Sequence, residues 1–583
     1  MKKFLLKVFF FIVSFGMSLF IIFTTFKNIF EAKYLLFPYA LHPFDIVSLY
    51  PDTWILLKKL YIISFSISYI ILYNKFSNLI YSKFSTNKQK TNPISLLETS
   101  SLSLFVGISN NIPIFISEKG LYQNILITGT IGTGKTSSAM YPFTKQLLKY
   151  NASNSLEKLA MLILDVKGNY FSKVIEYAKE FNRLNDVISI DLTTGFKYNP
   201  LDKPDLKPIV LANRLKTILT LFSPNSSESY WLDKSEQILA ECIKFCRLYN
   251  NGYVSFSELH KLIMFPEYYY QKLNITKELF KSGKYSNSEV YDLLTSIDFF
   301  EKEFFSLDSR TLSILKSEIS RITNIFVSDY NVSKTFCPAK KDINFHGFKE
   351  VLEKGKIVVL NMNISEYRNL SKIIATYLKL DFQTEVMSRL GKNVFIRKSA
   401  FISDEFHEYV TSTDADFLSG CREAKCINIV ATQSYSSIKN TLKDESSTKV
   451  ILQNLINKFW FRTDDMFTIE EAQKQIGKEE KEKFSTTISE NAKETNFNFI
   501  TNKFFSKNSN LSESYNKYTQ NDYIYDTNYF SQTLETFKSL AFISDGTKIF
   551  KPMQIQMIPY YNEKNFMKGF NLKWKIKNLT CQI

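Results

Sequence analysis

A glycine-rich run near residue 130 has the residue types and spacing of a phosphate-binding loop. The run reads G-T-I-G-T-G-K-T and matches the pattern G-x-x-x-x-G-K-[S/T]. An apolar stretch at 124–128 precedes it, and a helix start follows it. Glycines let the backbone curl so that successive N–H groups point at phosphate oxygens, and the following helix adds its positive amino end. The predicted nucleotide-binding residues are Gly129, Thr130, Ile131, Gly132, Thr133, Gly134, Lys135, Thr136 and Ser137.

Two residues of this loop have side chains suited to ATP and Mg²⁺. Lys135 is expected to reach the β- and γ-phosphates as a point charge, and the hydroxyl of Thr136 is expected to ligate Mg²⁺. The alternative is a glycine-rich turn that matches by accident, which average residue usage produces in about one chain in a hundred. The preceding strand pattern favours the nucleotide site.

A second pair of residues completes the prediction of a hydrolytic site. The apolar run 400–403 ends in Asp404 and Glu405, as in a Walker B strand. Asp404 is predicted to hold Mg²⁺, and Glu405 to orient and polarise the attacking water. An acidic pair at the end of a surface strand is the alternative.

Two polar residues farther along are candidates for supporting roles. Gln433 follows the buried run 427–432 and is predicted to sense the γ-phosphate, although a glutamine that only ends a strand has the same pattern. Arg422 is predicted either to enter a neighbouring subunit's site as an arginine finger or to be an ordinary surface arginine. The predicted catalytic residues are thus Lys135, Glu405, Gln433 and Arg422.

The amino-terminal part of the chain has the pattern of a membrane anchor. Residues 8–26 carry no charge, and as a helix these 19 residues would span about 28 Å, close to the hydrocarbon thickness. A shorter apolar stretch at 60–73 predicts a second span, so the anchor occupies residues 1–80 with helices at about 5–26 and 55–74. Lysines flank both outer ends, which predicts a short external loop and a nucleotide site in the cytoplasm of a bacterium, at its inner membrane.

Composition adds weaker constraints. The formal net charge is +16 and the pI is about 9.1, which favours an anionic partner such as nucleic acid or a membrane surface. AT-rich coding explains the same lysine excess without any ligand. None of the six cysteines forms a C-x-x-C pair, so the sequence predicts no zinc cluster and indicates reduced thiols.

Strand and helix patterns alternate on both sides of a long helical stretch. Apolar strand runs occur before residue 204 and again after residue 346, whereas the residues between have helical spacing only. The sequence therefore predicts an α/β domain formed by residues 95–204 and 346–583, with an all-α domain at 205–345 inserted in it. The polar segment 478–530 is predicted to be solvated or mobile, with short strands at most, and the apolar run 540–543 to rejoin the sheet.

These motifs together resemble the type IV coupling proteins, the membrane-anchored ATPases of conjugative DNA transfer and type IV secretion. The motifs that carry the resemblance, in chain order, are the two spans, Gly129–Thr136, the strand and turn Leu162–Gly168, Tyr198–Leu201, the helical stretch near Tyr230–Trp231, Asp404–Glu405, Arg422 and Thr432–Ser434. One departure is Asn169, where the family usually has Glu.

The resemblance implies a RecA-like P-loop domain with an inserted all-α domain. It also implies a homo-hexamer that uses ATP and Mg²⁺ to deliver a relaxase with its single-stranded DNA to a type IV secretion channel. Two alternatives stay open: a scaffold that recruits protein substrates and uses ATP for assembly, and a septal translocase of double-stranded DNA. The secretion-assembly ATPases usually lack a double-span anchor.

Overall fold

The described part of the chain is an α/β unit that begins after the predicted membrane anchor. The chain divides into a unit of residues 1–100 and a unit of residues 101–583. The predicted spans at about 5–26 and 55–74 lie outside the described residues, within which no helix has the length and apolarity needed to cross a membrane. The computed structural model describes residues 102–165, 167–222, 229–391, 395–492, 495–498, 503–506 and 509–562.

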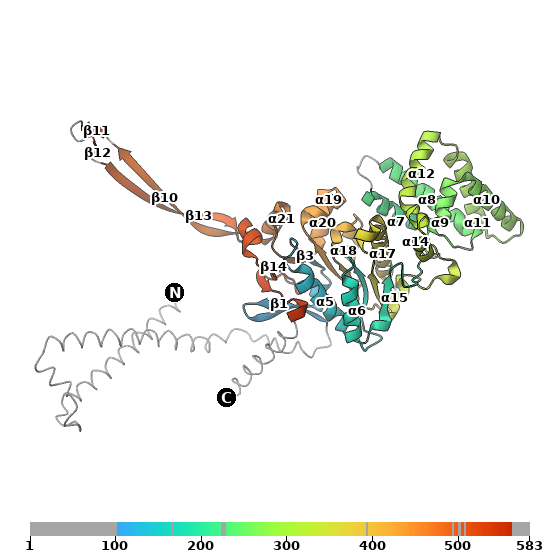
Figure 1. Cartoon of the computed structure of the whole chain (residues 1–583), viewed down its shortest axis with the longest axis horizontal. Coiled ribbons are helices and arrows are strands. Elements are labelled where there is room, and N and C mark those ends of the chain that lie inside the picture. Colours follow the sequence, from blue (N-terminus) through green and yellow to red (C-terminus); the bar gives the residue numbers. More distant parts are fainter. Residues whose placement is uncertain are drawn as a thin grey trace, which may run out of the picture. The chain divides into compact units, whose positions relative to one another are not determined.

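An 11-stranded sheet forms the centre of this unit (Figure 1). Its strand order is β2-β1-β15-β14-β9-β3-β8-β7-β4-β6-β5. The strands are β1 Ser103–Ser109, β2 Ile112–Ser117, β3 Ile125–Thr128, β4 Ala160–Leu164, β5 Val187–Ile190, β6 Ile357–Leu360, β7 Ser399–Ser403, β8 Cys426–Thr432, β9 Asn457–Trp460, β14 Lys538–Phe542 and β15 Met553–Gln556.

The strands from β9 to β5 in this order are parallel, and the other pairings are antiparallel. In the parallel part, β3 pairs with β8, β8 with β7, and β7 with β4. The carboxyl ends of these four strands therefore meet at one edge of the sheet. The phosphate loop follows β3, Gln433 follows β8, and Asp404 follows β7. The predicted return of residues 540–543 to the sheet is confirmed by β14, which pairs with β9.

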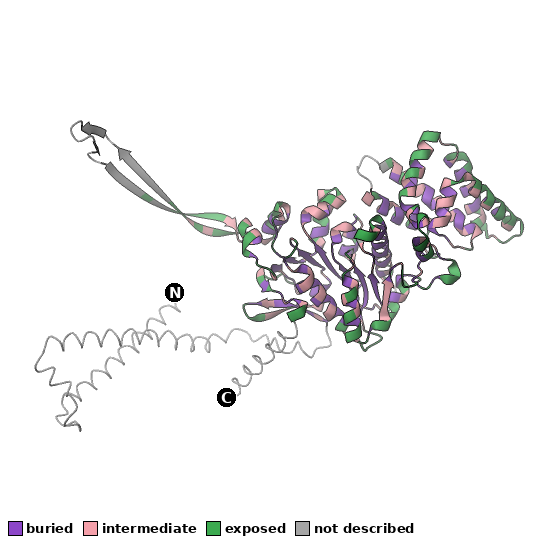
Figure 2. Cartoon of the chain, in the orientation of Figure 1, coloured by how far each residue is buried: buried purple, intermediate pink, exposed green. Residues whose placement is uncertain are grey.

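Residues of the central strands are buried, as the purple colour of these strands in Figure 2 shows. Every residue of β3, β4, β6, β7 and β8 is buried. Along β3, Leu126 contributes to one apolar core, whereas Ile125 and Ile127 contribute to the core on the other face. Continuous apolar runs are typical of parallel strands covered by helices on both sides.

The helices between β5 and β6 form a helical domain. Helix α11 Asn287–Asp298 continues into a π-helical stretch, Phe299–Phe304, and α12 Ser309–Thr323 follows. The described residues between β5 and β6 contain no strand. The helices here are α7 Pro208–Phe222, α8 Ser229–Tyr249, α9 Phe256–Met264, α10 Pro266–Lys281, α11 Asn287–Asp298, α12 Ser309–Thr323, α13 Ile325–Ser328, α14 Tyr330–Phe336 and, immediately before β6, α15 Phe348–Lys354.

The remaining helices connect the strands of the sheet. A π-helical turn, Thr136–Met140, follows the phosphate loop and leads into α5. Pro142 lies in the first turn of α5, where the missing backbone N–H of proline costs no hydrogen bond. The helices are α4 Glu118–Leu121, α5 Tyr141–Lys149, α6 Tyr170–Glu180, α16 Ile364–Tyr367, α17 Asn369–Met387, α18 Asp414–Gly420, α19 Tyr435–Leu442, α20 Glu445–Asn454 and α21 Met466–Ile476.

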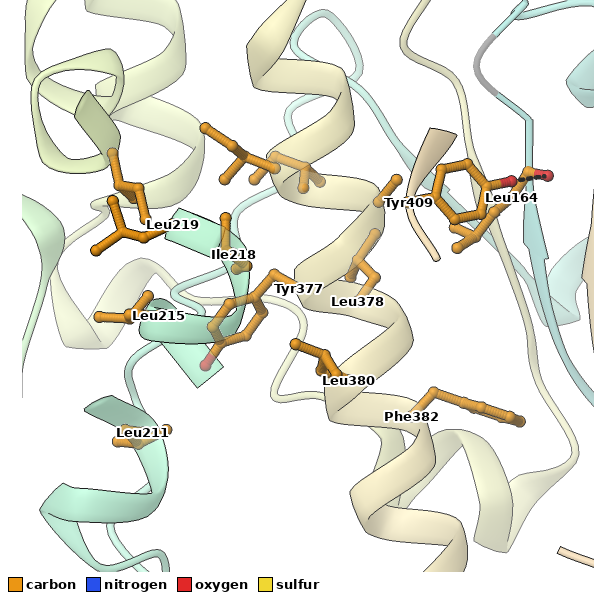
Figure 3. Packing of buried hydrophobic residues seen from close by; sticks show 14 of the residues in the cluster. Leu164, Leu211, Leu215, Ile218, Leu219, Tyr377, Leu378, Leu380, Phe382 and Tyr409 are labelled. Atoms are coloured by element: carbon orange, nitrogen blue, oxygen red, sulfur yellow. Dashed lines mark hydrogen bonds between the residues drawn. The ribbon is translucent and has the colours of Figure 1, made fainter. Parts of the chain in front are cut away.

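Helix α17 joins the helical domain to the sheet. Figure 3 shows it between the apolar side chains of α7, such as Leu215, and the pair formed by Tyr409 and Leu164. Most of its side chains are buried, so α17 is a central element of the larger core.

The polar segment after α21 differs from its prediction. Its strands β10 Lys478–Ala492 and β13 Ser509–Tyr523 are each 15 residues long and pair in antiparallel register, so the expectation of short strands at most was wrong. Two shorter strands, Thr495–Asn498 and Lys503–Ser506, form β11 and β12. The charged residues had predicted a segment without long strands. In the structure they form ion pairs across the ribbon, such as Lys483 with Asp522 at 3.0 Å.

Candidate nucleotide-binding site

The loop after β3 has the backbone geometry of a phosphate cradle. Gly132 and Gly134 have φ values of +80° and +94°, which side-chain-bearing residues rarely adopt. A Cβ atom on Gly134 would overlap the ring of Phe537, and one on Gly129 would lie 2.6 Å from Cβ of Phe461. The glycines are therefore required by backbone conformation and by close packing.

Hydrogen bonds from neighbouring strands brace this loop. Thr130 N donates to the carbonyl of Arg462 over 2.9 Å, and Phe537 N donates to the carbonyl of Thr133 over 3.1 Å. Within the loop, Thr133 Oγ1 donates to Thr130 O over 2.8 Å. Ile131 at the tip is 78% exposed. The loop is thus held from the side of β9 and β14, while its tip faces solvent.

Lys135 lies folded into the loop. Its side chain is buried, and Nζ donates to the carbonyl oxygens of Gly129 and Thr130. Burial lowers the pKa of Lys135, against the attraction of Glu405 and Asp404. An ammonium group held among loop carbonyls is placed to exchange these oxygens for those of a phosphate.

Thr136 and Asp404 are brought together, although 268 residues separate them in the chain. The hydroxyl of Thr136 donates to Oδ2 of Asp404 over 2.9 Å. The bond links the first residue after the phosphate loop to the end of β7. Both side chains offer oxygen ligands, which Mg²⁺ prefers, and Mg²⁺ takes only one or two protein groups when phosphates supply others. The described residues contain no group of three or more His, Cys, Asp or Glu side chains that could hold a metal ion.

Glu405 occupies a backbone conformation that is rare for its residue type. Its φ of +50° and ψ of +47° turn the chain sharply after β7 and leave the side chain buried. One carboxylate oxygen accepts an ion-paired hydrogen bond from Lys167, and the other lies 3.4 Å from Nε2 of Gln433. His407 Nδ1 lies 3.6 Å from the same oxygen. The structure therefore brings Gln433 to Glu405, at the edge predicted for both.

The carboxylates of the site differ in their pKa values. Burial, followed by the neighbouring charges of Asp165 and Glu405, raises the pKa of Asp404 to about 6. For Glu405 burial also opposes ionisation, but the hydrogen bond and the charge of Lys167 outweigh it and lower the pKa. The ion pair with Lys167 thus keeps the Glu405 carboxylate ionised, whereas the charged form of Asp404 is destabilised although the hydrogen bond from Thr136 and the charge of Lys167 partly oppose this.

Lys167 is the site residue that the sequence analysis did not propose. It follows β4, which pairs directly with β7, and its own pKa is raised by Glu405 although burial opposes this. Asp165 shapes the turn, because its carboxylate accepts hydrogen bonds from the backbone N–H groups of Lys167 and Tyr170. The signal in the sequence was the polar turn directly after a buried strand, which was noted only as part of the family resemblance.

Arg422 does not join this cluster. It is exposed in the turn before β8, whereas Gln433 follows the other end of that strand, so Arg422 lies at the opposite edge of the sheet. An action in a neighbouring subunit's site stays a prediction. Asn169 makes no side-chain capping bond at the start of α6, and it lines a small pocket of about 230 Å³ together with Lys167 and Gly168.

The residues of this site fit a nucleoside triphosphate with Mg²⁺. The loop and the helix start provide N–H donors, Lys135 provides a cation, and Thr136 and Asp404 provide oxygen ligands. Glu405 stands next to this pair with an ionised carboxylate. The arrangement is suited to binding phosphates and to polarising a water molecule beside them.

Comparison with known proteins finds similarity in one segment of the chain and in its fold. Residues 398–525 match a family model described as the TraM recognition site of TraD and TraG. This segment includes Asp404, Glu405 and Gln433. No curated protein matches the chain significantly.

Solved structures of the conjugative coupling protein TrwB have a similar fold. An unbound form matches with a TM-score of 0.52 at 11% identity, covering 79% of this chain and 89% of that one. A complex described as containing ADP and Mg²⁺ matches with a TM-score of 0.50 at 12% identity, covering 78% and 90%. Such low identity shows the fold alone: an α/β domain with a central parallel sheet and a helical domain. The matched segment and the shared fold are thus the features that this chain has in common with the type IV coupling proteins that it resembles.

Proposed function

We propose that the protein is a membrane-anchored ATPase that couples a relaxase, with its single-stranded DNA, to a type IV secretion channel. The observation that carries the proposal is the contact between Thr136 and Asp404, with Glu405 beside it. This contact joins the phosphate loop to the acidic end of β7. A glycine-rich turn without a nucleotide would have no need of a buried carboxylate at this place.

Each residue of the cluster has a role in ATP hydrolysis under this proposal. The loop N–H groups and Lys135 bind the phosphates, and Thr136 and Asp404 would hold Mg²⁺, which would neutralise phosphate charge. Glu405 accepts a proton from the attacking water, and Lys167 keeps this carboxylate ionised and oriented until then. Gln433, within reach of Glu405, relays the state of the γ-phosphate to β8.

The cellular role rests on the resemblance and on the sequence outside the described residues. The family segment at 398–525 supports recognition of a relaxosome component, by analogy with the TraM recognition named for TraD and TraG. The two predicted spans support an inner-membrane location with the ATPase in the cytoplasm. The net charge of +16 suits contact with nucleic-acid backbone. We further propose a homo-hexamer, in which Arg422 acts across the subunit boundary.

The test is ATP hydrolysis by the full-length protein in lipid nanodiscs, with single-stranded DNA, with double-stranded DNA and without DNA. Single-stranded DNA should stimulate turnover most. Lys135→Ala and Glu405→Gln should each lower turnover by about 100-fold or more. The exposed substitutions Lys149→Ala and Glu423→Gln are the matched controls and should leave turnover unchanged.

The possible outcomes separate the candidate functions. Turnover that ignores both Lys135→Ala and Glu405→Gln would remove the site assignment. Turnover that depends on both residues but not on DNA would favour the scaffold that recruits protein substrates. Preference for double-stranded DNA would favour a septal-type translocase. In cells, a Lys135→Ala allele expressed at the normal level should abolish conjugative transfer.

A further inference from the structure

A buried tyrosine lies directly behind the acidic end of β7. Tyr409 is fully buried and follows the short turn Phe406–Glu408. Its hydroxyl lies 2.6 Å from the backbone carbonyl oxygen of Asp404 and 3.2 Å from that of Leu164, and it accepts a hydrogen bond from Ser403 Oγ over 2.9 Å. Figure 3 shows the tyrosine facing the end of β4. One hydroxyl group thus touches the ends of both strands that bear the acidic residues.

This contact acts on the backbone of Asp404. Asp404 N already donates to Leu164 O over 3.0 Å, which is the last ladder bond between β4 and β7. The hydroxyl of Tyr409 adds a bond to the carbonyl of the same residue. The peptide groups on both sides of Asp404 are therefore fixed, although the next residue, Glu405, adopts a rare conformation. A carboxylate that must meet a metal ion benefits from a backbone held on both sides.

Tyr409 is itself fixed from helix α17. Lys379 is fully buried on this helix and donates to the backbone carbonyl of Tyr409 over 2.8 Å and to Thr411 Oγ1 over 3.1 Å. It also forms a buried ion pair with Asp414, whose other oxygen accepts from Gln383 over 2.7 Å. Buried charges survive only when they are paired and hydrogen-bonded. Lys379 therefore holds the loop after Tyr409 in a single arrangement.

Asp381, two positions after Lys379 on α17, makes a second set of buried contacts toward the start of the helical domain. It pairs with Lys203 over 2.8 Å and with Arg214 of α7 over 2.9 Å, and it accepts a hydrogen bond from Tyr198 over 3.0 Å. Helix α17 therefore carries two buried clusters: Lys379 binds the loop after Tyr409, and Asp381 binds Arg214 of α7. Helix α17 thus links the helical domain to the loop that carries Asp404.

We propose that Tyr409 is a positioning residue for the hydrolysis reaction, which holds Asp404 through its backbone carbonyl, and that Lys379 fixes Tyr409 from α17. This inference rests on the proposed ATPase function. The ring of Tyr409 contributes to packing, whereas its hydroxyl holds Asp404 and so affects the rate of the chemical step.

The test compares Tyr409→Phe with Tyr377→Phe in the full-length protein. Tyr377 is the matched control, because it is equally buried on α17 and its hydroxyl donates to Pro200 O rather than to the acidic loop. Tyr409→Phe should lower kcat about tenfold and raise the Mg²⁺ concentration for half-maximal rate several-fold. Tyr377→Phe should change neither by more than about twofold. Both variants should bind ATP in EDTA as the wild type does, because the phosphate loop is intact.

The double substitution Lys379→Met with Asp414→Asn tests the support from α17. It removes both buried charges together, so neither is left unpaired. If the double variant folds, it should lower kcat, and its effect should not add to that of Tyr409→Phe, because both act through one contact. If it does not fold, the comparison of the two tyrosines decides.

Two results would refute different parts of the reasoning. Wild-type protein without ATP turnover would refute the proposed function. Active wild type, with Tyr409→Phe indistinguishable from Tyr377→Phe in kcat and Mg²⁺ dependence, would refute only the positioning role. A loss of kcat in Tyr409→Phe that merely follows a loss of folded protein, seen as an equal drop in ATP binding, would also count against it.

Discussion

Replacing Asp404 with asparagine should stabilise the nucleotide-free protein at neutral pH while it removes a ligand for Mg²⁺. In the absence of a cation, burial and the neighbouring charges of Asp165 and Glu405 raise the pKa of Asp404 from 3.8 to about 6. The folded state therefore disfavours the ionised carboxylate. Asparagine keeps the size of the side chain and an oxygen that can accept the hydrogen bond from Thr136, but it carries no charge.

The magnitude follows from the linkage between protonation and folding. A pKa raised from 3.8 to about 6 corresponds to about 3 kcal/mol at about 1.36 kcal/mol per pH unit. Because the folded-state pKa is raised, the wild type has the full stability from this group below pH 3.8 and loses it as pH rises through about 6. The variant has no such loss. Its advantage should therefore grow by about 2 kcal/mol between pH 4.5 and pH 8.

Urea unfolding in EDTA at pH 4.5, 6 and 8 measures this difference. Asp416→Asn, on the exposed surface of α18, is the control and should follow the wild type at every pH. Addition of Mg²⁺ and ATP at pH 8 should raise the stability of the wild type more than that of Asp404→Asn, which keeps the phosphate loop but lacks a ligand for Mg²⁺. A stability difference that does not change with pH, or an Asp404→Asn variant less stable at pH 8, would refute the charge argument for this site.

Three further substitutions test other parts of the structure. Lys167→Met should lower kcat for ATP by about tenfold or more with little change in KM, because Glu405 loses the cation that keeps it ionised; an unchanged kcat in steady-state assays would contradict this role. Gly134→Ala should abolish ATP binding measured by calorimetry and lower the melting temperature, because its φ is +94° and a Cβ would overlap Phe537. Burial lowers the pKa of Lys458 to about 8, so the free energy of unfolding of the wild type should rise between pH 8 and 10.5. In urea unfolding, Lys458→Met should be more stable than the wild type by about 2–3 kcal/mol at pH 7 and should gain little at pH 10.5.

The motifs of the nucleotide site could be found from the sequence because each is local. The phosphate loop needs glycines, Lys135 and Thr136 within a few residues, and the strand before it is a continuous apolar run. The same holds for the strand that ends in Asp404. The edge strand β5 and the internal strand β9 were not predicted. β9 contains Asn457 and Lys458, whose polar side chains are buried by neighbours far away in the chain, so no local pattern marks it as a core strand.

The pairing of strands, and with it the assembly of the site, was decided only by the tertiary structure. Lys167 and Glu405 are 238 residues apart, and they meet because β4 lies next to β7. Tertiary packing likewise places Tyr409 against Leu164 and Lys379 against Asp414. The charged residues of β10 and β13 face each other across the paired strands, as Lys517 and Glu482 do at 2.8 Å, and no local pattern of the polar segment marked these strands. The amino-acid sequence by itself determined which groups can bind a nucleotide, since that depends on residue type and short spacing. Which of them touch depends on long-range packing that no short segment contains.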